Sequence, residues 1–160
     1  MIIEMDTREK AKATEKIKAE FARRNIQFIG TKLYVGDYRS LENPKFVIDR
    51  KQNLDEIYKN LCHERSGMLT RLEKEVIRAA NATIKMVILC EHGKNIKCIE
   101  DVKNWDNPRL KKTPYAWDGN KMYREMIKFS LKYNVEFLFC DKINTGRRII
   151  ELLEQENVER

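Results

Sequence analysis

Two carboxylates and one ammonium group, on Asp37, Asp49 and Lys51, are the groups that metal-assisted hydrolysis of a phosphodiester requires. Mg²⁺ prefers hard oxygen ligands and is usually held by one or two carboxylates together with waters and substrate oxygens. Such a cation lowers the pKa of an attacking water, and a neighbouring ammonium stabilises charge on the phosphoryl oxygens. The backbone carbonyl of Arg50 could supply a third ligand. The sequence therefore predicts a divalent-metal and phosphate site.

The period of a β-strand must bring these groups together. The apolar run Phe46–Ile48 predicts a buried strand, and alternation along it places the side chains of Asp49 and Lys51 on one face. An earlier extended stretch, Lys32–Val35, leads through a glycine into Asp37. Since the residues in between are few and rich in turn formers, we expect a hairpin that sets Asp37 beside the other two groups.

The charge balance of the chain indicates the class of its partner. The 160 residues carry a formal charge of +7, although acidic residues are also plentiful. Such an excess favours an anionic partner, and nucleic acid is the leading candidate. Apolar residues make up 42% of the chain and fall in clear segments, so the composition favours a folded chain over a disordered one. We expect a single folded domain over residues 1–160.

The sequence also predicts where the protein resides. No apolar run approaches the roughly 18 to 20 residues of a membrane span, and the first residues lack the pattern of a signal peptide. The four cysteines show no CxxC spacing, so we expect free thiols in a reducing compartment. These features predict a soluble, intracellular protein, of a size that a bacterium or a phage would encode for the cytoplasm.

Alternating strand and helix patterns predict the fold. Lys85–Cys90 is apolar on both faces, so we expect a central strand, parallel to a neighbour and covered by helices on both sides. Asp6 or Thr7, Asn53 and Asn120 are placed to cap helices. The order of elements predicts a three-layer α/β/α fold with a central mixed sheet. The other expected elements are strands over Met1–Met5, Ile26–Ile29, Leu33–Val35 and Val135–Cys140, and helices from Ala13 to about Arg24, over Leu54–Leu61, from Met68 to Ala80, near Ile99–Trp105, over Lys121–Tyr133 and from Thr145 onward.

Four charged motifs are more informative together than any one of them is alone. They are Asp6-Thr7-Arg8-Glu9, Gly36-Asp37-Tyr38, Ile48-Asp49-Arg50-Lys51 and Asp55. Their combined spacing resembles that of the nuclease domain of the XPF/Hef family of structure-specific endonucleases, within the PD-(D/E)XK, or restriction-endonuclease-like, superfamily. The resemblance extends over most of the chain, because the family's pattern is also similar to Arg71-Leu72-x-x-Glu75, Cys90-Glu91 and the closing helix-strand-helix.

The resemblance implies a restriction-endonuclease-like fold and an endonuclease that hydrolyses DNA with the help of Mg²⁺ or Mn²⁺. By similarity, Asp37 and Asp49 would ligate the metal and Lys51 would be catalytic. The acidic and phosphate-contacting surroundings would be completed by Asp6, Arg8 and Asp55. The implied substrate is branched or otherwise structured DNA, in repair, recombination or phage DNA processing.

Two features depart from the family's pattern. The family's usual Glu-Arg-Lys is here Asp49-Arg50-Lys51, whose carboxylate is shorter by one methylene, although the superfamily accepts either acid. The sequence given also ends at Arg160, without the paired helix-hairpin-helix module that is common in the family. We therefore expect junction recognition to depend on a homodimer, on a partner protein or on the chain's own loops.

Several residues have an ordinary structural explanation beside the functional one. Asp6 could cap a helix as well as support the site, and Asp55 could stabilise the first turn of a helix. The shorter acid at position 49 favours an alternative function, a nuclease fold that has lost catalysis and that binds DNA or regulates a partner. Retention of all three charged groups argues against that alternative.

A loop rich in aromatic and basic residues adds candidates for nucleic-acid contact. Tyr115 and Trp117 interleave with Lys111 and Lys112, a composition that suits stacking on bases and neutralising phosphates. The same aromatic residues could instead pack the loop onto the core. Together with Arg71, these four residues are the expected nucleic-acid contacts.

Overall fold

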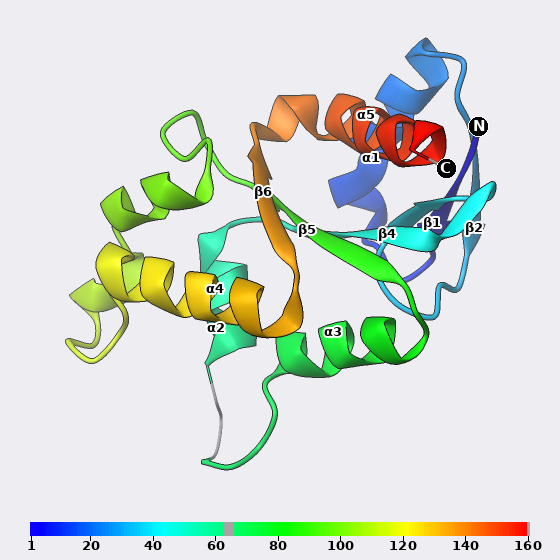
Figure 1. The fold of residues 1–160 in the computed structure, drawn as a ribbon. Coiled ribbons are helices and arrows are strands. Elements are labelled where there is room, and N and C mark those ends of the chain that lie inside the picture. The colour runs from blue at the N-terminus through cyan, green and yellow to red at the C-terminus, as the bar shows by residue number, and fades with distance from the viewer. Residues whose placement is uncertain (63–65, 160) are drawn as a thin grey trace.

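The computed structural model describes residues 1–62 and 66–159, and within them the chain folds into a six-stranded sheet with helices on both faces (Figure 1). The strands are β1 Ile2–Asp6, β2 Gln27–Thr31, β3 Tyr38–Ser40, β4 Asn43–Lys51, β5 Lys85–Glu91 and β6 Glu136–Cys140. The α-helices are α1 Ala11–Arg23, α2 Leu54–Leu61, α3 Arg71–Asn81, α4 Gly119–Tyr133 and α5 Thr145–Val158. Short 3₁₀ helices span Ile99–Asn104 (η1), Pro108–Lys111 (η2) and Lys142–Asn144 (η3).

The sheet is mixed, as the sequence predicted. Its strand order is β2-β1-β3-β4-β5-β6, in which β4, β5 and β6 are parallel and β3 runs antiparallel to both of its neighbours. The carboxyl ends of β4 and β5 lie side by side, because Lys51 pairs in register with Cys90. Side chains at these two ends therefore meet at one edge of the sheet, which is where ligands bind in many α/β folds.

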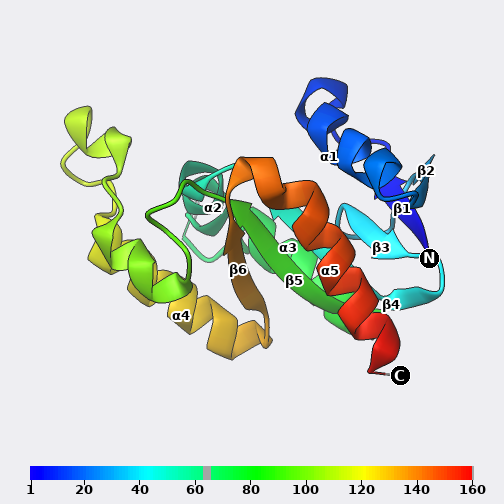
Figure 2. The ribbon, with the colours of Figure 1, turned by 90° about the horizontal axis from the view of Figure 1, so that it is seen from above.

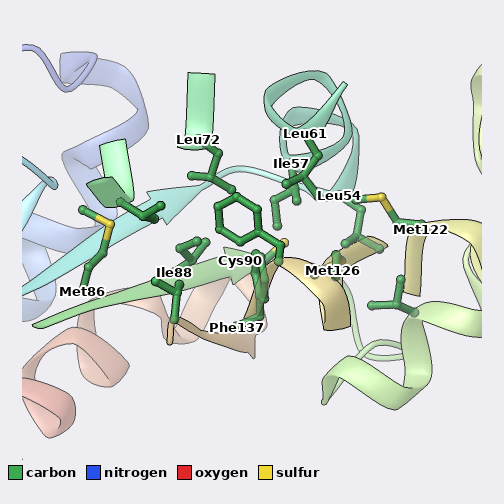
Figure 3. Close-up of a cluster of buried hydrophobic side chains, with 14 of the residues drawn as sticks. Leu54, Ile57, Leu61, Leu72, Met86, Ile88, Cys90, Met122, Met126 and Phe137 are labelled. Carbon is green, nitrogen blue, oxygen red and sulfur yellow. The ribbon is translucent and has the colours of Figure 1, made fainter. Parts of the chain in front are cut away.

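Two hydrophobic cores, one on each face of the sheet, fix the orientation of β4. Val47 belongs to the core under α2, α3 and α4, whereas Ile48 belongs to the core under α1 and α5. Figure 3 shows the first of these cores, in which the side chains of Leu54, Ile57, Leu61, Leu72, Met122 and Met126 gather over Ile88 and Cys90. Because strand side chains alternate, Asp49 and Lys51 must point to the face of Val47, and Arg50 to the opposite face.

The predicted hairpin is wrong, because the segment expected to pair with β4 is not a strand. Residues 32–35 form no strand. Leu33 and Val35 are instead buried as part of a loop, and the Leu33 amide donates to Asp6 Oδ2 (2.8 Å). The strand that pairs antiparallel with β4 is β3, which begins after Asp37, while β2 pairs in parallel with β1. The pattern misled because two apolar residues in an extended loop are as easily buried as two residues of a strand.

Helix starts also differ from the expectation in two places. Helix α3 begins at Arg71, where Thr70 and Glu73 form a reciprocal capping box, so Met68 and Leu69 precede the helix and are about half exposed. Helix α4 is capped by Asp118 rather than by Asn120. The predicted cap at the start of α2 is confirmed, since the Asn53 side chain accepts from the Glu56 amide (2.9 Å).

Two further expectations concern the cysteines and the membrane. All four cysteines carry free thiols, as expected from their spacing. Across residues 1–62 and 66–159, none of the helices combines the length and the apolar character needed to cross a bilayer.

Candidate active site

Gly36 sets the position of Asp37. Its φ is +73°, and a Cβ at this position would lie 2.9 Å from the Cβ of Val47, so only glycine fits the turn. The Asp37 amide donates to the carbonyl of Ile48 (2.8 Å), and its carbonyl accepts from the Asp6 amide (2.8 Å). The backbone of Asp37 is thereby tied to β4 and to β1, which points its carboxylate at the end of β4.

Asp49 and Lys51 form a close pair on one face of β4, as predicted. The Lys51 Nζ lies 2.8 Å from Asp49 Oδ2, and both side chains are less than 10% exposed. Burial lowers the pKa of Lys51, but its pairing with the negative charge of Asp49 outweighs burial, so the pKa lies above its usual value. Lys51 is therefore an ammonium at neutral pH.

Asp37 lies beside this pair. Its Oδ2 accepts from the backbone amide of Arg50 (2.7 Å). Burial raises its pKa well above the usual range, and the negative charges of Asp49 and Glu9 raise it further. Three carboxylates thus crowd into one small space, an arrangement that a divalent cation would relieve.

The oxygen atoms of Asp37 and Asp49 could supply some of the ligands of a hard divalent ion. Asp49 Oδ2 is buried and accepts no hydrogen bond of normal geometry, although the Lys51 ammonium is near enough to form an ion pair with it. Two carboxylates are enough for Mg²⁺, which completes its shell with waters and substrate oxygens. No group of three or more His, Cys, Asp or Glu side chains is arranged for metal binding in the described ranges 1–62 and 66–159.

Arg50 anchors the other face of β4. Its guanidinium is 2% exposed and donates to Glu9 Oε2 (2.7 Å) and to Glu91 Oε1 (3.0 Å). The Tyr38 hydroxyl donates to the same oxygen of Glu9 (3.1 Å). Burial works against the charge of Arg50, but the hydrogen bond and charge of Glu9 outweigh it and raise its pKa. Because the amide of Arg50 also holds Asp37, this network orients the carboxylate on the opposite face.

Asp6 supports the site but does not cap the helix. The cap position of α1 is Lys10, which makes no capping hydrogen bond through its side chain, so the helix-cap interpretation of Asp6 and Thr7 is wrong. Asp6 is buried and accepts from the backbone and the guanidinium of Arg8 at 2.7 to 2.8 Å. Arg8 also donates to the carbonyl of Leu33 (3.1 Å), which fixes the loop that leads to Asp37.

A cavity of about 180 Å³ joins these groups, and we call it the acidic cleft. Its charged lining consists of four cationic and five carboxylate side chains, Arg8, Arg50, Lys51, Arg71, Glu9, Asp37, Asp49, Glu56 and Glu75. Five of the expected site residues, Arg8, Asp37, Asp49, Arg50 and Lys51, thus meet here, and so does Arg71 from the first turn of α3. Sequence reasoning assigned no role to the glutamates that line the cleft.

Asp55 does not reach the acidic cleft. Its carboxylate pairs with Arg109 (2.5 Å) and with Lys59 (3.1 Å), and Asp55 is not among the residues that line the cleft. Trp117 packs edge-on against Tyr58, with ring centroids 5.2 Å apart, in line with the loop-packing alternative. The other expected contacts in this loop lie outside the cleft, with Lys111 and Lys112 exposed and Tyr115 91% exposed.

Some site residues that the sequence left without a role could have been found from strand order. Glu91 ends β5, and parallel strands end at a common edge, so an acidic residue there is expected near the end of β4. Glu9 stands in the first of the four charged motifs, but its contact with Arg50 could not be foreseen, because only the path of the chain between β1 and α1 brings the two together. Glu56 and Glu75 come from two different helices, whose mutual placement no local pattern predicts.

Comparison with known proteins agrees with this architecture. A family model described as the ERCC4 domain matches residues 5–153. Among solved structures, XPF from Aeropyrum pernix is similar, with a TM-score of 0.68 and 20% identity over 98% of this chain and 65% of that one. XPF from Aeropyrum pernix in complex with DNA is also similar, with a TM-score of 0.66 and 19% identity over 99% of this chain and 66% of that one. This chain thus spans about two thirds of those proteins. A search of curated proteins gave no significant match.

Proposed function

Because this chain belongs to the ERCC4 domain family, we propose that it is a metal-dependent endonuclease that hydrolyses phosphodiester bonds in DNA. The observation that carries the proposal is the convergence of Asp37, Asp49 and Lys51 in one acidic cleft, from a turn and a strand end that are held by separate hydrogen bonds. The solved structure of an archaeal XPF with DNA supports DNA as the substrate.

Each of the three residues has a distinct role in this proposal. Asp37 and Asp49 hold Mg²⁺ or Mn²⁺, with the Arg50 carbonyl as a further ligand, and the bound ion supplies Lewis-acid chemistry and a more acidic water. Lys51 places its ammonium against the phosphoryl oxygens, where negative charge develops as the bond to phosphorus breaks. Its pairing with Asp49 keeps the ammonium in position before substrate binds.

The neighbouring residues position these groups without touching the reacting atoms. Arg50 holds the carboxylate of Asp37 through its backbone amide, and its buried guanidinium keeps the end of β4 fixed between Glu9 and Glu91. Asp6 keeps Arg8 on the rim of the acidic cleft, where the Arg8 side chain is 56% exposed and within reach of a phosphate. Arg71 offers a second exposed cation on the same rim.

We further propose that the substrate is branched or structured DNA, as the XPF/Hef resemblance implies, in repair, recombination or phage DNA processing. Recognition of a junction would then depend on a second copy of the chain or on a partner protein. We treat residues 1–160 as the nuclease unit of this activity.

The direct test uses purified protein with labelled fork, flap, four-way-junction and linear duplex DNA, with Mg²⁺, Mn²⁺ or EDTA. We expect cleavage of the branched substrates that requires the metal and that falls at least about 10²-fold in Lys51→Ala and in Asp37→Asn. Lys132→Ala, an exposed lysine on α4 at the edge of a different cavity, is the matched control. Cleavage that survives both site variants would contradict the site assignment, and binding without any cleavage would favour the inactive module.

A further inference from the structure

A second cavity lies on the opposite face of β4 from the paired side chains of Asp49 and Lys51. It measures about 450 Å³ and lies between α1 and the connection from β6 to α5, two segments that cover the same face of the sheet (Figures 1 and 2). We call it the lysine groove, after four of its lining residues, Lys10, Lys12, Lys16 and Lys142. Its remaining charges are one carboxylate, Glu15, and the mutually paired Arg50 and Glu91. The groove therefore has a clear excess of positive charge.

The four lysines of the groove have no acidic partners. None of them forms an ion pair in the part of the chain that the structure describes, and one carboxylate cannot neutralise four ammonium groups. Some lysines on other surfaces do have partners, namely Lys59 with Asp55, Lys85 with Glu156, Lys128 with Glu125 and Lys132 with Glu73. Other exposed lysines among the described residues are also without an ion pair, but in this groove four such ammonium groups line one cavity with a single unpaired carboxylate.

Three of these lysines occupy positions that helix energetics disfavour. Lys10 is the cap residue of α1 and Lys12 lies in its first turn, where the positive end of the helix dipole repels cations, and this turn contains no acidic residue. Lys12 and Lys16 are also spaced i, i+4, so their charges repel across one turn. Residues that break local rules without a structural gain are expected at functional sites. An anion in the groove would remove all of these penalties at once.

The lysine groove adjoins the acidic cleft along the chain. Glu9 lines the cleft and the next residue, Lys10, lines the groove. At the end of β4, Lys51 likewise lines the cleft and Gln52 lines the groove. Consecutive Cα atoms are about 3.8 Å apart, and Arg50 lines both cavities. Since successive nucleotides of one strand rise about 3.4 Å along a duplex, a strand leaving the cleft would reach the groove within a few nucleotides.

We propose that the lysine groove binds the phosphate backbone of the DNA substrate, a few nucleotides from the scissile bond. This inference rests on the proposed function, because it takes DNA as the molecule whose phosphate occupies the acidic cleft. A continuous polyanion fits the lysines better than a small anion does, since they span from the start of α1 to η3 and since Arg50 lines both the groove and the cleft. The groove supplies affinity and register, and the cleft supplies the chemistry.

The test measures binding of a fluorescent DNA fork to the full chain in EDTA, over a range of salt concentrations. In the groove variant, lysines 10, 12, 16 and 142 are changed to glutamine. We expect its DNA affinity at low salt to fall at least about 10-fold, and the slope of log K against log salt to fall by about 0.9 for each lysine that contacts a phosphate. The matched control changes an equal number of ion-paired lysines to glutamine, namely Lys59, Lys85, Lys128 and Lys132.

The control separates the groove from net charge, because both variants lose four positive charges. A selective loss in the groove variant supports the proposal, provided that its melting temperature matches that of the control. An equal loss in both variants, or a loss in neither, would overturn it. A groove variant that binds the fork normally but no longer binds dATP, assayed separately, would overturn it too, because the groove would then be a nucleotide site.

Failure of this inference is distinguishable from failure of the proposed function. Only the groove assignment fails if the unmodified protein cleaves DNA with metal, Lys51→Ala does not, and the groove variant binds DNA normally. If binding depends on the groove lysines and no substrate is ever cleaved, the groove stands and the nuclease proposal fails.

Discussion

The acidic cleft and the lysine groove share Arg50, yet their charges are arranged in opposite ways. In the cleft, carboxylates outnumber cations, and three basic residues are tied to acids through the pairs Lys51–Asp49, Arg50–Glu9 and Arg8–Asp6. In the groove, four lysines face a single unpaired carboxylate. The cleft on its own would repel a phosphate until a cation neutralises it, whereas the groove attracts one at any time. Affinity and chemistry are therefore expected to reside in neighbouring but separable regions.

The largest effect on folding is expected at Arg50, because both cavities depend on it. Arg50→Leu would leave Glu91, which is 2% exposed, and Glu9, which is 14% exposed, without a cation. Removing one partner of a buried ion pair costs about 3 to 5 kcal/mol of unfolding free energy, to be measured by urea titration. Arg23→Leu is the control, because it removes an exposed partner of Glu20 and should change the unfolding free energy far less than Arg50→Leu does. Equal costs for the two variants would show that the network does not fix the end of β4.

Asp6 is expected to contribute a smaller and pH-dependent stabilisation to the wall of the acidic cleft. Burial raises its pKa, but hydrogen bonds from Arg8 and Leu33 outweigh burial and lower the pKa below its usual value. A carboxyl whose pKa is lower in the folded state stabilises the fold above its unfolded pKa, about 3.9, and this contribution is lost as pH falls through the folded pKa.

We therefore expect Asp6→Asn to lower the unfolding free energy by about 1 to 3 kcal/mol at pH 7. The difference from the unmodified protein should shrink as the pH falls below about 4, which urea titrations at pH 7 and pH 3 would measure. A difference that stays constant over this range would mean that the pairing with Arg8 contributes nothing.

The comparison of the two cavities also predicts that removing an acid from the cleft improves binding. At a pH at which Asp37 is ionised, Asp37→Asn deletes one of the crowded negative charges, so without metal its affinity for DNA should rise about 5-fold, equivalent to about 1 kcal/mol. Fluorescence anisotropy in EDTA measures this change, and the gain should disappear once Mg²⁺ is added. Weaker binding of Asp37→Asn in EDTA would contradict the view that the cleft repels phosphate.

The smallest effect is expected at Asp55, which lies outside both cavities. Asp55→Asn weakens its ion pairs with Arg109 and Lys59, which are partly exposed, so the unfolding free energy should change by less than about 1 kcal/mol. The cleavage rate on a fork should stay within about twofold of the unmodified protein. A loss of 10²-fold would place Asp55 in the catalytic surroundings, as the XPF/Hef resemblance implied.

The features that followed from the sequence are those set by local periodicity. Alternation along β4 correctly placed Asp49 and Lys51 on one face, and the continuous apolar run Lys85–Cys90 correctly marked a central parallel strand. The caps and the hairpin were harder, because Asp118 competes with Asn120 and a buried loop residue such as Leu33 resembles a strand residue. Local patterns predict a strand and the faces of its side chains, but they do not predict which of several neighbouring polar residues caps a helix.

The remaining parts of the site depend on contacts between distant segments. Asp55 pairs with Arg109, a residue 54 positions away along the chain. No local pattern predicts this pairing, which places the Asp55 carboxylate outside the acidic cleft. Lysines 10, 12 and 16 meet Lys142 only because α1 and the β6–α5 connection cover the same face of the sheet. Their excess charge was visible in the composition, but its concentration in one groove was not.

The most direct test of this division of labour measures binding and cleavage on the same labelled DNA fork. Asp37→Asn and the groove variant are compared with the unmodified protein, in EDTA for binding and in Mn²⁺ for cleavage. We expect Asp37→Asn to bind the fork without cutting it. The groove variant should bind weakly, yet cut once the protein is raised well above its increased Kd. Asp37→Asn that cuts, or a groove variant that binds as tightly as the unmodified protein, would contradict the account.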